Sequence, residues 1–129
     1  MLKDQGGITV LEGNYAEAIE YLVSSIKMCF KLGHKQFVAT GMGSLSFAVG
    51  LRGDPEPRQA SILSAQLGGA SEILMEEIGL TPWTKGSQLV QLARQFIRSR
   101  VDEESWLNAW AEGRDFTIEQ AVDLACRLA

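Results

Sequence analysis

The 129-residue chain has few of the residue types from which metal and catalytic sites are usually built. It contains one histidine, His34, and two cysteines, Cys29 and Cys126, which lie far apart and outside any Cys-x-x-Cys pair. A zinc site or a disulfide framework needs more such residues at closer spacing, so we expect both cysteines to be reduced thiols in the core. We predict no metal and no cofactor. Because no set of nucleophile, base and orienting group can be assembled, we do not expect an enzyme.

Long apolar runs and a surplus of positive charge are also missing. No 18 consecutive residues are apolar, so the sequence predicts no membrane span. Residues 1–10 lack the apolar block of a signal peptide, which favours a cytoplasmic location. The formal net charge is −4, whereas nucleic-acid binders usually carry a basic surplus or a basic face. We therefore expect no direct contact with nucleic acid or membrane.

What the sequence does contain is helical periodicity. In residues 15–32, apolar side chains recur every three or four positions along one face, and Gly33 then provides a C-cap. A second helix is expected over residues 35–52. Residues 36–51 carry no charge, which is typical of a helix enclosed by neighbours.

Capping residues predict four more helices and hence an all-α fold. The first has Asp54 as N-cap and Pro55 at its first position, and it reaches Ile78. The second covers most of residues 87–100. The third runs from Asp102 to Gly113, and a capping box at Thr117-Ile118-Glu119-Gln120 starts the last, which continues towards Leu128.

Two similar segments, Leu11-Glu12-Gly13-Asn14-Tyr15 and Leu51-Arg52-Gly53-Asp54-Pro55, suggest an internal helical repeat. The stretch Gly13-Asn14-Tyr15-Ala16-Glu17-Ala18-Ile19 resembles the turn and second helix of a tetratricopeptide (TPR) repeat. The resemblance covers roughly one and a half repeats. It implies TPR-like helical hairpins stacked as a short α-solenoid.

The second half of the chain carries a further resemblance. Residues 69–79, 105–114 and 117–122 are similar to segments near the end of bacterial LuxR-type and SARP-type transcriptional regulators with a STAND-type ATPase. This resemblance implies a signalling role and a single helical-repeat domain over residues 1–129. Residues 1–80 would form TPR-like hairpins and residues 81–129 a terminal helical cap. The family's ATPase and DNA-binding parts are not expected within these residues.

The resemblance favours a protein-interaction or effector-sensing module, whose partner is a protein, a peptide or another domain of a larger regulator. In such stacks the first helix of each hairpin lines a concave groove. The candidate groove residues are therefore Phe37, Thr40, Ser44 and Phe47. The alternative is a structural element for self-association, with a homodimer formed through Ile8, Val10 or the 36–51 helix.

Several local features allow both a functional and a purely structural interpretation. Thr40-Gly41-Met42-Gly43-Ser44 suggests a phosphate loop, but its helical setting favours close helix packing. Trp106 and Trp110 stand one turn apart as a possible ligand-stacking pair. We favour core packing of both tryptophans together with Phe96 and Phe116.

The charged residues are also ambiguous. Glu76 and Glu77 sit at a helix C-terminus, where negative charge is unfavourable. They would suit a basic partner, although a plain surface position is favoured. Residues 83–100 have a net charge of +4 and residues 101–123 one of −6. We expect these two segments to pair within the chain and not to bind nucleic acid.

Overall fold

Helices account for all regular structure in the described part of the chain. A computed structural model describes residues 14–53, 56–80 and 88–128, apart from the side chain of Leu89, and none of these residues lies in a strand. The helices are α2 (Tyr15–Lys31), α3 (Lys35–Arg52), α4 (Pro57–Glu77), α5 (Gln88–Arg98), α6 (Glu103–Arg114) and α7 (Ile118–Cys126). The predicted all-α class is confirmed.

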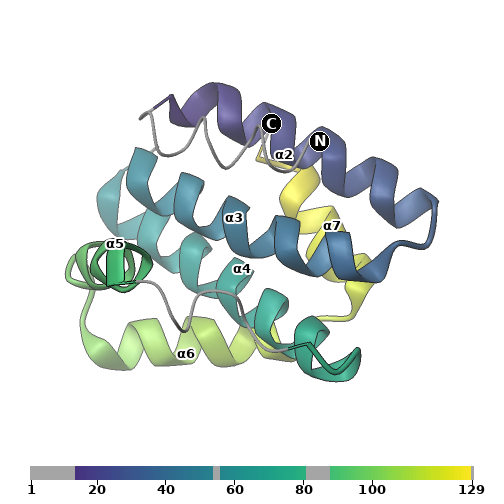
Figure 1. Cartoon of the computed structure of the whole chain (residues 1–129). Coiled ribbons are helices and arrows are strands. Elements are labelled where there is room, and N and C mark those ends of the chain that lie inside the picture. The colour runs from purple at the N-terminus through teal and green to yellow at the C-terminus, as the bar shows by residue number, and fades with distance from the viewer. Residues whose placement is uncertain (1–13, 54–55, 81–87, 129) are drawn as a thin grey trace.

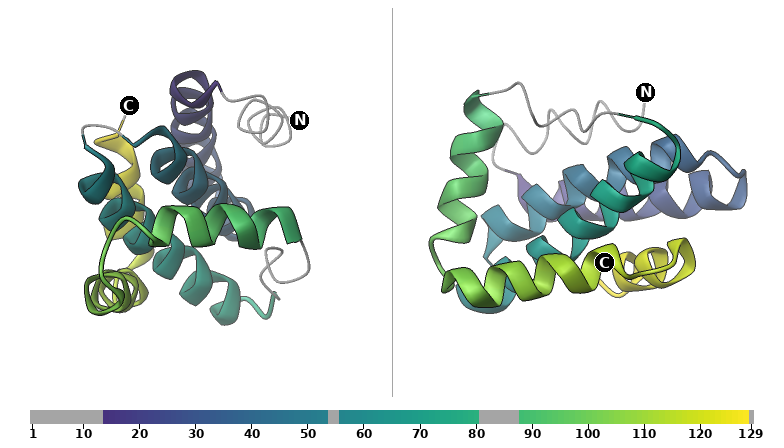
Figure 2. Two further views of the ribbon diagram at one scale, coloured as in Figure 1. Left: turned by 90° about the vertical axis from the view of Figure 1, so that its left-hand side faces the viewer. Right: turned by 90° about the horizontal axis from the view of Figure 1, so that it is seen from below.

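The helices α2, α3 and α4 run back and forth, each packed on the next (Figure 1). On the other side of α4 lies α6, and α7 returns to pack against both α2 and α4. The short helix α5 lies across the ends of α3 and α4 (Figure 2). A solenoid is built from contacts between neighbours in sequence, so the contact of α7 with α2 is an addition to that pattern. The stacked-repeat arrangement stays a prediction.

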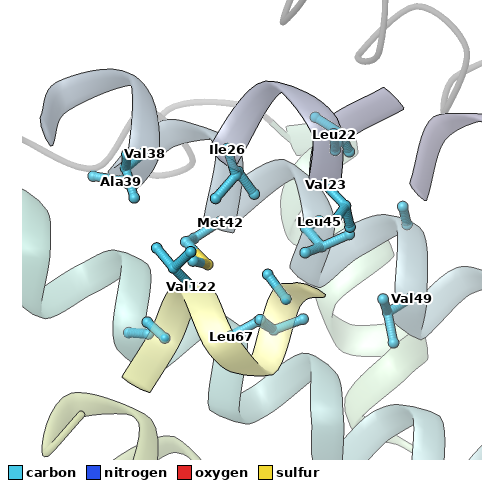
Figure 3. Packing of buried hydrophobic residues seen from close by; sticks show 14 of the residues in the cluster. Leu22, Val23, Ile26, Val38, Ala39, Met42, Leu45, Val49, Leu67 and Val122 are labelled. Carbon is cyan, nitrogen blue, oxygen red and sulfur yellow. The ribbon is translucent and has the colours of Figure 1, made fainter. Parts of the chain in front are cut away.

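The larger core cluster is formed by side chains from α2, α3, α4 and α7 (Figure 3). The uncharged stretch of α3 lies at its centre, and residues 41–50 are all buried. Gly41 allows close packing here, because a Cβ at this position would lie 2.9 Å from Cγ1 of Ile26. The segment 40–44 is therefore tightly packed helix, as predicted, and not a phosphate loop.

This burial bears on the predicted dimer surfaces. Most of α3 is enclosed within one chain, so a homodimer through the 36–51 helix would have to displace packed neighbours. The other two residues suggested for such an interface, Ile8 and Val10, lie outside the described residues. Both cysteines are free thiols and are partly buried beside the same core.

Helix ends follow local capping chemistry. Gly33 and Gly79 adopt positive φ angles of 77° and 76° just after α2 and α4. Asp102 caps α6 by accepting hydrogen bonds from the Ser105 hydroxyl (2.7 Å) and amide (3.0 Å), which hold the pKa of Asp102 below its usual value. The capping box of Thr117 and Gln120 is present in both directions.

Two predicted helix ends were wrong. The helix α4 begins at Pro57, and its N-cap is Glu56, whose carboxylate accepts from the Gln59 amide at 2.9 Å. The expected cap, Asp54, lies outside the described residues with Pro55. Gly113 does not end α6 but is buried within it, because α4 and α6 approach too closely there for a larger residue.

Candidate protein-interaction surface

Inward-facing groups hold α5 firmly against α3 and α4. The fully buried Ile97 packs on Gly50, where a Cβ would lie only 2.6 Å from Cδ1 of Ile97. The Ser61 hydroxyl donates to the Ile97 carbonyl at 2.7 Å. Just beyond the helix, Nη1 of Arg100 donates to the Gly50 carbonyl at 2.7 Å. The position of α5 is therefore set by backbone-level contacts with two other helices.

Arg94 supplies a further anchor on the inner side of α5. Its guanidinium carbon lies 4.1 Å from the ring centroid of Phe47 and 5.2 Å from that of Trp110. Nη1 of Arg94 donates to the Ser46 hydroxyl at 2.9 Å. Burial lowers the pKa of Arg94 to about 10, and the charge of Glu72 partly opposes this shift. The side chain thus remains a cation at neutral pH, held on aromatic rings.

Ser46 connects three helices. Its hydroxyl donates to the Ser64 carbonyl at 2.6 Å, while the Ser64 hydroxyl donates to the Ser46 carbonyl at 2.7 Å. Both serines are fully buried between α3 and α4. Because the Ser46 hydroxyl also accepts from Arg94, it links this helix pair to α5.

Replacing Ser46 with alanine is therefore expected to lower the free energy of unfolding more than replacing another serine buried between α3 and α4. The first change removes the acceptor of a charged donor, and we expect a loss of about 2 kcal/mol. The control Ser71→Ala removes one neutral hydrogen bond to the Ala39 carbonyl, and we expect it to lower the free energy of unfolding by about 1 kcal/mol. Urea unfolding followed by circular dichroism measures both. Equal losses would show that the bond to Arg94 adds nothing.

A second polar network joins α4 to α6. Oε1 of Glu72 accepts from Nε1 of Trp110 at 3.1 Å and from Nη1 of Arg114 at 2.5 Å. Arg114 also donates twice to Glu76, and these bonds, with those to Glu72, raise the pKa of Arg114. Glu76, considered above as a contact for a basic partner, therefore has a cation within the chain.

Among the described residues, one ion pair joins the basic segment to the acidic segment, so the pairing predicted between them is present only in part. Arg98 pairs with Glu103 at 3.4 Å, and Arg94 and Arg100 have the contacts given above. Lys85 lies outside the described residues. Core packing of the tryptophans is also confirmed, since Trp106 is 2% exposed and Trp110 packs against the same cluster.

Two large apolar side chains of α5 lie outside the arc that packs on the core, and both are exposed. Leu92 is 54% exposed and Phe96 is 57% exposed. They stand four residues apart, hence about one helical turn, and we call them the α5 outer pair. The guanidinium of Arg100 lies over the Phe96 ring, 4.7 Å from its centroid. In the left view of Figure 2, α5 is the foremost helix.

The prediction that Phe96 packs with the tryptophans was wrong. Apolar residues cover two arcs of α5, and the inner arc of Val90, Ala93 and Ile97 takes the contact with the core. Phe116 is partly buried, but it packs against the larger cluster instead. The sequence did contain a signal for the exposed pair. Together, the apolar residues between 89 and 97 cover more of the helix surface than one helix contact can bury.

The four predicted groove residues lie along one side of α3 but differ in accessibility. Phe37 and Thr40 are partly exposed, whereas Ser44 (9%) and Phe47 (5%) are buried. Phe47 lies beneath the Arg94 guanidinium and supports α5. The structure therefore leaves only the first two open to a ligand, and the groove itself stays a prediction.

An open depression of about 410 Å³ lies near the turn between α2 and α3. It is lined by Gly33, His34, Lys35, Gln36, Ile78 and Leu80. His34 is exposed here, with its ring edge towards Phe37. Within the described ranges, no three His, Cys, Asp or Glu side chains are placed to hold a metal ion. None of the described helices is both long and apolar enough to span a bilayer.

No protein-family model, curated protein or solved structure matches this chain. The likeness to TPR repeats and to bacterial regulators therefore stays a prediction from the sequence. The geometry of α5 and of the residues that anchor it is the basis for the function proposed next.

Proposed function

We propose that this chain is a helical protein-interaction module that presents the outer side of α5 to a protein partner. The supporting observation is the α5 outer pair, two large apolar side chains more than half exposed on a helix fixed from behind. A helix that is already held in place loses little conformational freedom on binding. Apolar residues one turn apart are also the usual anchors of helix-mediated recognition.

The same proposal includes the setting suggested by the sequence. The back-and-forth packing of α2, α3 and α4 is compatible with TPR-like hairpins, and such modules commonly bind proteins or peptides. We therefore propose a cytoplasmic interaction module belonging to a bacterial transcriptional regulator. Structural self-association of the chain is the alternative function.

Photo-crosslinking distinguishes the two functions. With p-benzoylphenylalanine in place of Phe96, irradiation in cells is expected to yield an adduct with another protein. The matched control places the same group at Leu107 of α6, which is 51% exposed. The adduct should disappear when Leu92→Gln is added. An adduct of two copies of this chain would instead support self-association, and equal yields from both positions would contradict the proposal.

A further inference from the structure

We infer that the partner of the α5 outer pair is an amphipathic helix that carries carboxylates beside its apolar residues. This inference rests on the proposed function and specifies the chemistry of its partner. It follows from the shape of the outer face of α5, from the charges around it and from the area that the pair offers.

The shape of this surface suits a helix. Leu92 and Phe96 form a short ridge along α5, and side chains spaced by four residues on a second helix pack into the grooves beside such a ridge. Because α5 is anchored through Ile97, Arg94 and Arg100, the ridge is rigid enough to select a shape. A partner helix with apolar residues one turn apart would cover both side chains at once.

The charge next to the ridge is positive. The Arg100 guanidinium lies over Phe96, and its bond to the Gly50 carbonyl occupies one of five N–H donors. Residues 83–100 contain no acidic residue, so α5 itself offers this guanidinium no carboxylate. When the apolar residues of the partner helix cover Phe96, a carboxylate beside them would reach Arg100. Partly desolvated pairs of this kind contribute to specificity and to the rate of association.

Other occupants fit this surface less well. A second copy docked through α5 would again lack acidic residues between 83 and 100. Two folded copies also need roughly 800 Å² per partner for a stable interface, whereas a two-residue ridge suits the narrower contact of a single helix. A membrane surface needs a broad apolar face along a helix, whereas most of the apolar side chains of α5 face inward. A carboxylate-bearing helix remains as the occupant.

The test uses two fluorescent helix-favouring peptides that both contain leucines four residues apart. In one peptide glutamates flank the leucines, and in the other lysines do. With the full chain, fluorescence anisotropy should give an affinity about ten-fold higher for the glutamate peptide. Phe96→Gln should weaken its binding about ten-fold. The control Leu107→Gln, on exposed α6 surface, should leave it unchanged.

Arg100→Gln removes the charge and, because glutamine is the shorter side chain, also the bond to the Gly50 carbonyl. This variant should bind both peptides alike, after circular dichroism has confirmed an unchanged fold. The inference is overturned if neither peptide binds, if wild type does not distinguish them, or if phosphatidylglycerol vesicles bind and the peptides do not. A crosslink from position 96 to another protein without a preference for glutamate would overturn the inference alone and leave the proposed function standing.

Discussion

Gly113→Ala is expected to lower the free energy of unfolding by about 3 kcal/mol or more. Within an ordinary helix, replacing glycine with alanine stabilises by up to about 1 kcal/mol. Here the added Cβ would lie 2.0 Å from the Gln66 carbonyl oxygen and 2.8 Å from its carbon. Because these atoms belong to the backbone of α4, the clash is relieved only by separating α4 from α6. Urea unfolding followed by circular dichroism measures the loss.

The matched control is Ala111→Gly, at an exposed position of the same helix. This change alters helix propensity without touching α4, and we expect it to cost about 1 kcal/mol. Gly69→Ala is the reciprocal test, since its Cβ would lie 2.1 Å from the Trp110 carbonyl oxygen. A Gly113→Ala variant as stable as wild type would mean that α4 and α6 do not touch at this point.

Arg94→Ala is expected to destabilise the fold by about 2–3 kcal/mol, whereas Arg94→Met should change the stability by less than about 1 kcal/mol. Alanine uncovers Phe47 and leaves a cavity between α5 and α3. Methionine keeps an unbranched apolar side chain against Phe47 and removes a charge that burial disfavours. Urea unfolding of both variants beside wild type gives the comparison. An equal loss in both would mean that the charge itself stabilises α5.

The pH dependence of stability gives an independent check on the effect of burying Arg94. The pKa of Arg94 is about 10 in the folded chain, against an ordinary value of 12.5. Above pH 10 the unfolded state therefore holds more protons at Arg94 than the folded state does. The contribution of Arg94 to the free energy of unfolding then rises with pH. The stability of wild type relative to Arg94→Met should be constant up to about pH 9 and then increase. Titration of other groups cancels in this difference, and a flat difference to pH 11 would contradict the effect of burial.

Local sequence signals were sufficient where helix ends depend on nearby residues. The start of α2 at Tyr15 and the end of α3 at Arg52 were predicted as observed, and so were the caps formed by Asp102 and Thr117. The end of α3 and the starts of α6 and α7 each have a capping residue beside them, Gly53, Asp102 and Thr117. The enclosure of α3 was also foreseeable, because a helix without charge has no face that prefers water.

Features that depend on where helices cross were not predictable in this way. A glycine near the end of a helix usually marks a C-cap. Gly113 instead allows the backbones of α4 and α6 to approach closely, and no local sequence pattern indicates that approach. Phe96 was predicted to pack in the core with the two tryptophans. Only the docking of Arg94 and Ile97 decides which arc faces inward. The α5 outer pair was therefore missed, although its residues were visible in the sequence.

The return of α7 to α2 has a consequence for how the chain is made. Ala121, Val122 and Ala125 complete the cluster that encloses α2 and α3, and all three are synthesised after those helices. Repeat stacks with contacts only between neighbours can fold progressively from any point. Here the apolar sides of α2 and α3 stay incompletely covered on the ribosome until the closing helix emerges. A nascent chain that stalls before α7 is made therefore exposes an aggregation-prone surface.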